Sequence, residues 1–583
     1  MARKPAVKAS VTRPPDGKAG PSPAAAGFYD TRLAPFLERY AVLLFVCLVA
    51  IASVRIWSTY SVFSLTVDEP GHFACGLEYL QKHTYQFESQ HPPLGRAMSA
   101  LGPFLDGVRL RGSRNHNEEG VDVVRHTADP NRTVTLMRAG ILPLFWLACL
   151  VVFLWARRDF SKPTAVLATA LFTMIPPVLA HAGLATTDMA LTACLAAAFF
   201  ALTLWARHPN WKTGLLLGLA AASAALSKFT SLGFLPAAAL LALGFYLATQ
   251  WPGFRRLAVL LRERIASFAL AVAAGSLLVW GCYWFSYGIV PGWQIKLPAP
   301  EFFDGVSVAM RHNTVGHNAY LLGVSGTKGW WYYFPITLSV KTPIAFLLLL
   351  LAGIASCWKS RAKPGFLLPL AFSLGILFTG MAGNVNIGVR HILPVYIGFS
   401  MIAGIAVSNL LRRGAAPMGL AVALVLWTAV SGAVKHPDYL AYFNELIRSE
   451  PEKVLVDSDL DWGQDLKRLS RRMRELGAAR IAIEPFGPPS LPLLYGLPPA
   501  EAVDPSFPTQ VWTVIHPTIA YTLDRGGNGN MAGTDYASIV NAAQARLPWF
   551  LQTDPTERVG ALLLFKTPKE KLVALTPESQ AAH

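Results

Sequence analysis

The sequence predicts a polytopic α-helical membrane protein, with about eleven transmembrane helices and a small extracytoplasmic α/β domain at its C-terminal end. Of its 583 residues, 53% are hydrophobic and only 15% are charged, which is too apolar a balance for a soluble globular protein of this length. Apolar runs long enough to cross a bilayer recur between residues 40 and 434, and the pattern then stops.

The first 35 residues are expected to form a disordered, basic cytosolic tail. They are rich in Ala, Pro, Lys and Arg and contain neither the apolar core nor the cleavage site of a signal peptide. Arg32 and Arg39 precede the first apolar run and place the N-terminus in the cytosol. The formal net charge of +16 also suits nucleic acid, but the basic residues gather in short loops between apolar runs. We therefore interpret the charge as membrane orientation and expect no nucleic-acid partner.

The membrane domain is expected to cover residues 36–435, with multiple passes through a bacterial inner membrane. The predicted spans are 40–60, 136–155, 164–180, 189–205, 213–227, 229–250, 267–287, 343–358 and 419–434, with two further runs that end near 383 and 412. Basic residues follow every second span, as expected for cytosolic loops. Because eleven spans start from a cytosolic N-terminus, the C-terminus is expected outside. Two long external loops result, 61–133 and 288–342, and the first should contain one or two short interfacial helices.

The remaining residues, 436–583, are no longer membrane-like and predict the extracytoplasmic α/β domain. Short strands are expected at 453–457, 480–483, 511–515 and 561–565, and a basic amphipathic helix at 462–476. An acidic string at 457–465 offers carboxylates for a cation or an acceptor, although we interpret it as a solvated loop between a strand and a helix.

An acidic pair and a histidine follow the first span, in the stretch 67–73. Pro70 suits the first turn of a helix, and Glu69 just before it is placed to cap that helix. Such a helix puts His72 one turn beyond Asp68. We expect Asp68 to be the reactive group, held at the membrane surface by this helix.

Other polar side chains map to the same external face of the membrane. Carboxylates there offer a general base or a metal site, and cations offer a clamp for a phosphate. The candidate site residues are Asp68, Glu69, His72, His91, Asp188, Lys228, His317, Lys341, Arg390 and His391.

Each candidate also has a structural interpretation. The acidic pair and Asp188 suit helix caps, and His91 precedes two prolines as in a simple loop turn. The long cationic side chains suit interfacial anchors, with the charge reaching the lipid headgroups. It is the gathering of these groups on one face that favours a functional site.

Several motifs resemble those of protein O-mannosyltransferases and, more broadly, of the GT-C glycosyltransferases that depend on a phospholipid carrier, which include the bacterial aminoarabinose transferases. The motifs are Asp68-Glu69 with His72-Phe73, the run 91–95, Thr187-Asp188-Met189, the run 227–230, the run 316–323, Tyr332-Tyr333-Phe334-Pro335 with 341–343, and the run 386–394. The resemblance covers about 68–394, most of the membrane part.

The resemblance implies a GT-C glycosyltransferase fold and transfer of a sugar from a polyprenyl-phosphate donor to a hydroxyl on the external face. By the same resemblance, Asp68 with Glu69 forms the catalytic pair, Asp68 being the general base of a single inverting displacement. Lys228, Lys341 and Arg390 are the expected phosphate ligands. The acceptor, whether glycolipid, polysaccharide or protein, stays open.

Two features leave alternatives open. The mannosyltransferase pattern has one residue between the acidic pair and the histidine, whereas here Pro70 and Gly71 intervene, so protein O-mannosylation specifically is an alternative. Asp68, Glu69 and Asp188 are the residues that would hold a divalent cation, which no spacing requires. A transporter or flippase of lipid-linked sugars and a non-catalytic assembly factor are the rival functions.

Overall fold

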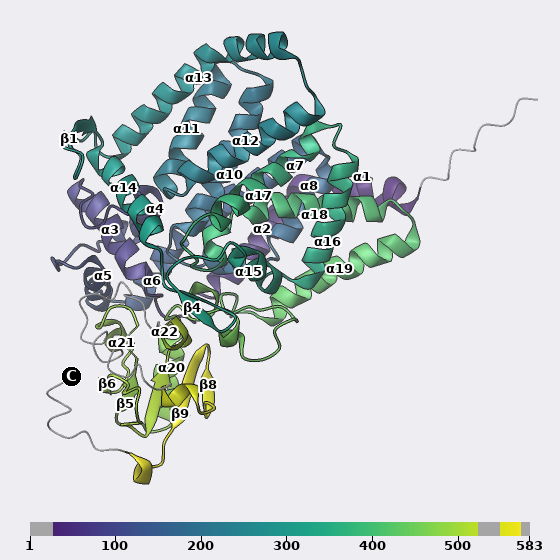
Figure 1. Cartoon of the computed structure of the whole chain (residues 1–583). Coiled ribbons are helices and arrows are strands. Elements are labelled where there is room, and N and C mark those ends of the chain that lie inside the picture. Colours follow the sequence, from purple (N-terminus) through teal and green to yellow (C-terminus); the bar gives the residue numbers. More distant parts are fainter. Residues whose placement is uncertain (1–26, 485, 523–547, 573–583) are drawn as a thin grey trace, which may run out of the picture.

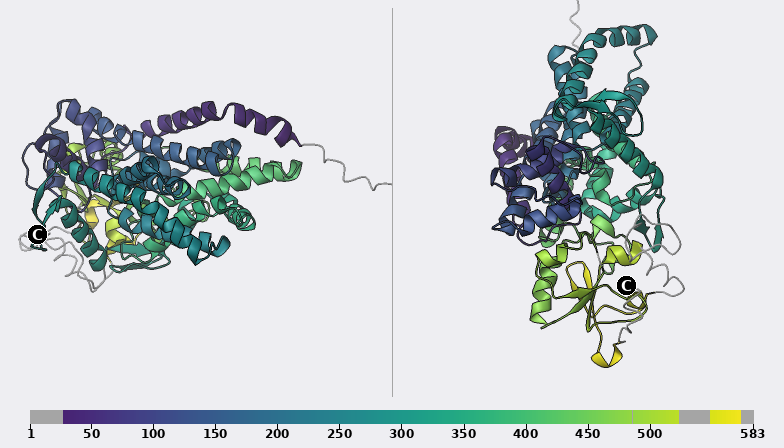
Figure 2. Two further views of the ribbon diagram at one scale, coloured as in Figure 1. Left: turned by 90° about the horizontal axis from the view of Figure 1, so that it is seen from above. Right: turned by 90° about the vertical axis from the view of Figure 1, so that its left-hand side faces the viewer.

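The structure is a computed structural model that describes residues 27–484, 486–522 and 548–572. Figure 1 shows a helical bundle above a smaller part that contains a sheet. The right-hand view of Figure 2 places this sheet at one end of the molecule, with the teal helix α13 (Phe254–Cys282) toward the other.

Each predicted apolar run corresponds to a helix. These helices are α2 (Ala41–Trp57), α7 (Leu142–Asp159), α8 (Lys162–Phe172), α10 (Asp188–Arg207), α11 (Trp211–Ser227), α12 (Ser231–Thr249), α13 (Phe254–Cys282), α16 (Ile344–Lys359), α17 (Leu368–Met381), α18 (Val395–Leu411) and α19 (Ala415–Val434). In the described part of the chain, five helical segments are long and apolar enough to cross a membrane, or eight if each bent pair counts as one span. The protein is therefore a multi-pass membrane protein, and the number eleven stays a prediction.

Burial separates peripheral from central helices. Only 11% of the apolar window of α12 or α13 is buried inside the protein, against 67% for α10. Apolar side chains such as Leu240 and Val272 are exposed, as expected for contact with lipid. The shorter helices α17 and α18 are mostly buried against neighbouring helices. They are therefore surrounded by protein, whereas the peripheral helices contact lipid.

Small residues allow the helices to pack closely. A Cβ atom added to Gly353 of α16 would lie 2.1 Å from the carbonyl oxygen of Ile402 in α18, and one added to Gly218 of α11 would lie 2.1 Å from that of Ala271 in α13. These glycines permit the close approach that is typical of membrane helix pairs.

The N-terminal region begins as helix earlier than predicted. The short helices η1 (Tyr29–Leu33) and α1 (Ala34–Arg39) precede α2, and the Tyr29 hydroxyl lies 3.2 Å from Ser408 Oγ in α18. The expectation of a disordered tail up to residue 35 is therefore wrong for these residues, because Tyr29 is buried against the bundle. The rest of that prediction, residues 1–26, lies outside the described residues.

The first external loop contains more helix than predicted. It holds α3 (Glu69–Lys82), α4 (Pro93–Leu105), α5 (His116–Arg125) and α6 (Pro130–Ala139). Pro70 lies in the first turn of α3 as expected, but the helix already includes Glu69. Asp68 occupies the N-cap position and makes no side-chain cap hydrogen bond. The predicted capping role of Glu69 is therefore wrong.

Four further features complete the membrane part. The span predicted at 267–287 belongs to α13, which begins at Phe254 and thus includes the basic segment in its first turns. The short helix α9 (Pro176–Ala182) follows α8 at a bend of 72°. The second external loop forms two antiparallel hairpins and two helices: β1 (Tyr287–Ile289) with β2 (Lys296–Pro298), α14 (Pro300–Val315), β3 (Ala319–Leu321) with β4 (Val324–Gly326), and α15 (Tyr333–Lys341). Helix α15 turns back against α16 at 118°.

The C-terminal part contains a five-stranded mixed sheet in the order β6-β5-β7-β9-β8. Its strands are β5 (Ile481–Ile483), β6 (Ala500–Glu501), β7 (Trp512–Ile515), β8 (Glu557–Val559) and β9 (Leu562–Lys566). Strand β5 pairs in parallel with β6 and β7, whereas β9 pairs antiparallel with β7 and β8. The helices are α20 (Leu466–Glu475), α21 (Leu491–Leu494) and α22 (Pro517–Thr522).

One predicted strand of this part is wrong. Residues 453–457 join two short 3-10 helices, η4 (Pro451–Lys453) and η5 (Asp457–Asp459). Asp457 has a φ of +60°, which is left-handed and not extended. The predicted strands near 481, 512 and 562 are confirmed as β5, β7 and β9.

The stability of the C-terminal part is expected to fall as the pH rises. Burial raises the pKa of the Asp465 carboxyl, at the start of α20, to about 6, although Arg468 and the Ala561 N–H oppose the rise. Stability from this group is complete below its unfolded pKa of about 4 and is lost as the pH passes 6. We expect a loss of about 1 to 3 kcal/mol.

Thermal unfolding of the wild type and of Asp465→Asn between pH 4.5 and 7.5 measures this effect. The melting temperature of the variant should fall less across this range. Equal slopes in the two proteins would contradict the role of Asp465.

Candidate active site

A cavity of about 1150 Å³ opens between the first external loop, α14, the segment before α18 and the C-terminal part. Seven of the ten predicted site residues line it: Asp68, His72, His91, Lys228, His317, Arg390 and His391. The fold therefore brings together groups that lie more than 300 residues apart in sequence, such as Asp68 and Arg390.

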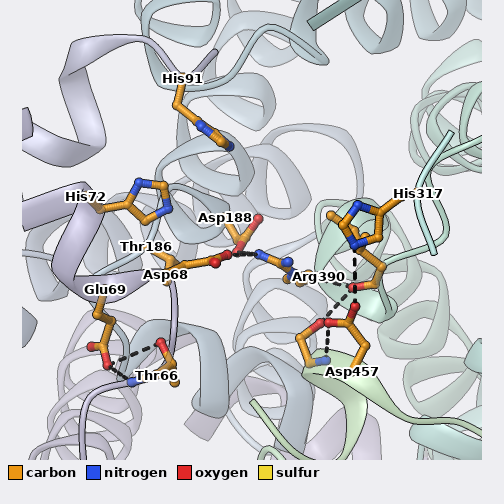
Figure 3. Close-up of polar contacts among 12 residues, drawn as sticks. Thr66, Asp68, Glu69, His72, His91, Thr186, Asp188, His317, Arg390 and Asp457 are labelled. Atoms are coloured by element: carbon orange, nitrogen blue, oxygen red, sulfur yellow. Dashed lines mark hydrogen bonds and ion pairs between the residues drawn. The ribbon is translucent and has the colours of Figure 1, made fainter. Parts of the chain in front are cut away.

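Asp68 faces the cavity and contacts a cation. Its Oδ2 accepts a hydrogen bond of 3.0 Å from Arg390 Nη1, and the two side chains point toward one another in Figure 3. The Asp68 side chain is 37% exposed, more than those of Glu88 and Asp457, which are the other carboxylates among the described lining residues. Asp68 is therefore the carboxylate most accessible to a molecule in the cavity.

Arg390 belongs to the short helix η3 (Val389–Ile392). Its guanidinium carbon lies 4.0 Å from the centre of the Trp462 ring, and Nε donates to the Ile387 carbonyl at 3.3 Å. Burial alone would lower the pKa of Arg390, but the charges of Asp68 and Asp188 raise it above its ordinary value. The guanidinium is thus permanently charged and oriented.

Asp188 lies behind this pair. It is the first residue of α10, where Oδ1 accepts from Lys228 Nζ at 2.6 Å and Oδ2 accepts from Thr186 Oγ1 at 3.2 Å. Arg390 Nη1 is 4.0 Å from the same Oδ2. Two carboxylates and two cations therefore alternate through Asp68, Arg390, Asp188 and Lys228.

His72 and His91 form one wall with two residues that sequence reasoning missed, Glu88 and Arg96. Arg96 Nε donates to His72 Nδ1 at 3.0 Å, so the proton of the His72 ring is on Nε2. Arg96 also pairs with Glu88, which contacts His91 Nδ1 at 3.2 Å. Burial opposes ionisation of Glu88, but Arg96 and His91 hold its pKa well below its usual range.

His317 and His391 lie on the side of the cavity formed by later parts of the chain. His317 Nε2 is 3.9 Å from Asp457 Oδ2, as Figure 3 shows at its right. The His391 ring stacks on Phe334 at 5.7 Å, and its Nδ1 has no hydrogen-bond partner among the described residues. Burial, reinforced by the Lys228 charge, lowers the pKa of His391 to about 3, so this ring is neutral at pH 7.

Glu69 does not line the cavity. Its carboxylate is fully buried and accepts from the Thr66 N–H at 2.8 Å, from Arg138 Nε at 2.9 Å and from the Ala185 N–H at 2.9 Å. Figure 3 shows Glu69 pointing toward Thr66 and away from Asp68. It connects the start of α3 to α6 and to the turn before α10.

Lys341 also lies away from the cavity. Its Nζ donates to the carbonyl oxygens of Leu440 and Asp459, at 2.8 and 2.5 Å, and lies 4.4 Å from the centre of the Phe443 ring. It therefore ties α15 to the beginning of the C-terminal part.

The carboxylates that were considered for a metal do not converge. Glu69 is paired with Arg138 and Asp188 with Lys228. In the ranges that the structure describes, no group of three His, Cys, Asp or Glu side chains is placed to hold a metal ion.

Residues 137–280 match the family model for dolichyl-phosphate-mannose-protein mannosyltransferases. The match covers 144 of the 583 residues. The match confirms the resemblance found in the sequence, and with it the enzyme class, a membrane glycosyltransferase with a lipid-phosphate sugar donor. It spans α7 to α13 and includes Asp188 and Lys228, whereas Asp68 and Arg390 lie outside it.

Among solved structures, the glycosyltransferase is similar to ArnT from Cupriavidus metallidurans bound to undecaprenyl phosphate, with 18% identity, a TM-score of 0.43, and coverage of 67% of this chain and 70% of that one. It is also similar to the Pmt1-Pmt2 complex of S. cerevisiae bound to the sugar donor, with 18% identity, a TM-score of 0.33 and coverage of 42% and 33%. No curated protein matches the chain.

The acidic string 457–465 of the glycosyltransferase is not the solvated loop that was predicted. Asp459, Asp461 and Trp462 are buried, because this segment packs against the part of the chain that carries Arg390. Ser458 Oγ donates to the Ile387 carbonyl at 2.7 Å, and Asp459 Oδ1 accepts from the Val389 N–H at 3.1 Å.

The same segment of the glycosyltransferase holds the chain that leads to Asp68. The Ser64 N–H donates to the Gln464 carbonyl and the Val67 N–H to the Trp462 carbonyl, both at 3.0 Å. The segment 457–465 thus contacts both loops that carry the Asp68–Arg390 pair. Sequence reasoning noticed the string, but only the tertiary structure shows what it touches.

Proposed function

We propose that this protein is an inverting glycosyltransferase that moves a sugar from a polyprenyl phosphate to an acceptor hydroxyl. The observation that carries the proposal is the meeting of an accessible carboxylate, Asp68, with Arg390 and Lys228 in one large cavity. Transfer of a sugar from a lipid phosphate requires a base for the acceptor hydroxyl and cations for the leaving phosphate, close together.

In the proposed reaction, Asp68 takes the proton of the acceptor hydroxyl as its oxygen attacks the anomeric carbon. The bond from that carbon to the phosphate oxygen breaks, and the configuration inverts. The leaving polyprenyl phosphate gains negative charge, which Arg390 and Lys228 stabilise. The Nε2–H of His72 is a further donor at the same cavity. Arg390 Nη1 orients Asp68 and Nε donates to the Ile387 carbonyl, so the Nη2 donors remain for phosphate.

Two expected site residues receive other roles. Glu69, expected beside Asp68 as catalytic, is assigned to holding the start of α3 through Arg138. Lys341, expected as a phosphate ligand, is assigned to anchoring the C-terminal part. Both side chains are buried away from the cavity, so neither can reach a substrate in this conformation.

We further propose eleven spans, a cytosolic N-terminus and an extracytoplasmic domain from residue 436 in a bacterial inner membrane. The basic start of α13 lies toward the end of the bundle away from the C-terminal sheet (Figures 1 and 2), which supports this orientation under the positive-inside rule.

Purified protein in nanodiscs, incubated with a panel of polyprenyl-phosphate sugars and membrane extract, tests the function. Mass spectrometry should detect a glycosylated product and free polyprenyl phosphate in equal amounts. Movement of labelled lipid across the bilayer without a new glycosidic bond would instead indicate a transporter. The product also shows whether the acceptor is a glycolipid, a polysaccharide or a protein.

Trp462 is expected to act as a positioning residue. Its ring supports the Arg390 guanidinium at 4.0 Å and its carbonyl holds the Val67 N–H. We expect Trp462→Leu to lower kcat about 10- to 100-fold with little change in KM, because a misplaced base costs rate more than binding. Trp462→Phe keeps an aromatic face and should restore most of the rate. Equal losses in both variants, or a change in KM alone, would contradict this role.

A further inference from the structure

A second cavity, of about 460 Å³, lies between the first external loop and the C-terminal part. Ser61, Pro130 and Asn131 line it from the membrane part, and Lys467, Arg471 and Arg474 line it from α20. It shares no lining residue with the cavity of Asp68.

The cations of α20 divide between two faces of the helix. On the face away from this cavity, Arg468 pairs with Asp438 and Asp465, and Arg472 pairs with Glu475 and Glu557. Their charges are therefore compensated within the protein.

The face toward the cavity is not compensated in this way. Lys467, Arg471 and Arg474 follow one another at helical spacings of four and three residues, which puts them on one side. Among the described residues, the hydrogen bonds of these side chains run from Lys467 Nζ to the Ser61 carbonyl, at 3.4 Å, and from Arg474 Nη1 to Ser470 Oγ, at 2.8 Å. Lys467 Nζ also lies 5.8 Å from the centre of the Tyr495 ring. Arg471 approaches Glu475 no closer than 3.9 Å, and the described lining residues include no Asp or Glu.

Three like charges around a partly enclosed space repel one another unless an anion lies between them. Burial, helped by the Arg138 charge and opposed by that of Glu69, lowers the pKa of Lys467 to about 8. Pro130 and Asn131 also begin the apolar helical segment Pro130–Asp159, so the cavity adjoins the start of a candidate span.

We propose that this cavity binds a phosphate group. Arginine forks and a lysine match phosphate oxygens in charge and in donor geometry. The phosphate belongs either to the headgroup of an anionic membrane lipid or to a soluble phosphate-bearing molecule. The inference is independent of the proposed sugar transfer.

The test compares three full-length proteins. The first is the wild type, and the second is the triple variant Lys467→Gln, Arg471→Gln, Arg474→Gln. The control replaces Lys566, Lys569 and Lys571 with Gln, which removes the same charge from exposed positions elsewhere in the C-terminal part. Native mass spectrometry measures retained phosphatidylglycerol against phosphatidylcholine, and thermal unfolding at constant ionic strength measures stabilisation by inorganic phosphate against chloride.

The wild type and the control should bind phosphatidylglycerol or inorganic phosphate at least about tenfold more tightly than the triple variant, as expected for the loss of one charge-assisted contact or more. Lipid binding alone identifies a headgroup site, and stabilisation by inorganic phosphate alone identifies a soluble ligand. Equal binding by all three proteins, or binding of neither probe by the wild type, overturns the proposal. Because Arg471 is exposed, Arg471→Gln alone provides a folded variant with the same expected direction.

Discussion

Replacing Asp68 with asparagine is expected to lower kcat for sugar transfer by about 10²- to 10⁴-fold, the usual contribution of a general base. Asparagine has nearly the same shape and can still accept the hydrogen bond from Arg390, but it cannot take the acceptor proton. The protein should stay folded, because an ion pair with a partly exposed carboxylate contributes little stability, about 0 to 1 kcal/mol.

The measurement is single-turnover release of polyprenyl phosphate, with the melting temperature recorded in parallel. Asp457→Asn is the matched control, since Asp457 also lines the cavity and, among the described residues, has no Lys or Arg partner; its nearest basic side chain is His317, at 3.9 Å. Full activity of Asp68→Asn would refute its role as base. A dead Asp457→Asn beside an active Asp68→Asn would move that role to Asp457.

Replacing the neighbouring Glu69 with glutamine is expected to destabilise the protein by about 3 to 5 kcal/mol, as when one partner of a buried ion pair is removed. The partners of the Glu69 carboxylate, including Thr66, Arg138 and Ala185, are hydrogen-bond donors. The amide nitrogen of glutamine would face these donors with no acceptor. The buried Arg138 guanidinium would lose its counter-charge.

Thermal unfolding in detergent or nanodiscs measures this loss, with Glu475→Gln as the control. Glu475 is about half exposed on α20, and its replacement should change stability by less than about 1 kcal/mol. A Glu69→Gln protein with the melting temperature of the wild type but no activity would indicate that Glu69 takes part in the reaction. Together, the two substitutions separate the adjacent carboxylates by their effects, one on rate and the other on stability.

The sequence alone determined the class of protein and most of the apolar helices. Long apolar runs have no stable alternative to helix in a bilayer, because every backbone polar group must be satisfied within the segment. The same runs predicted that Asp68, Lys228 and Arg390 lie on one face, since each residue follows or precedes a span whose direction was predicted from the basic loops. That inference needed only the order of spans and loops.

The local sequence pattern did not predict the structure of polar segments that fold against one another. Residues 453–457 were predicted as a strand, and 457–465 as a solvated loop. In the structure, however, Trp462 packs under Arg390 and Asp459 binds the Val389 N–H. These partners lie about 70 residues away in sequence, and neither periodicity nor composition carries information about such contacts.

The acidic pair shows the same division between sequence and tertiary structure. Two adjacent carboxylates after the first span marked the site, and this followed from residue type and position. Which of them is accessible to a substrate depends on surroundings that come from distant parts of the chain: Arg138 and Ala185 enclose Glu69, whereas Arg390 holds Asp68 at an open cavity. Only the tertiary structure decides this, because burial and the nearest charge, which fix what a carboxylate can do, are properties of the packed chain.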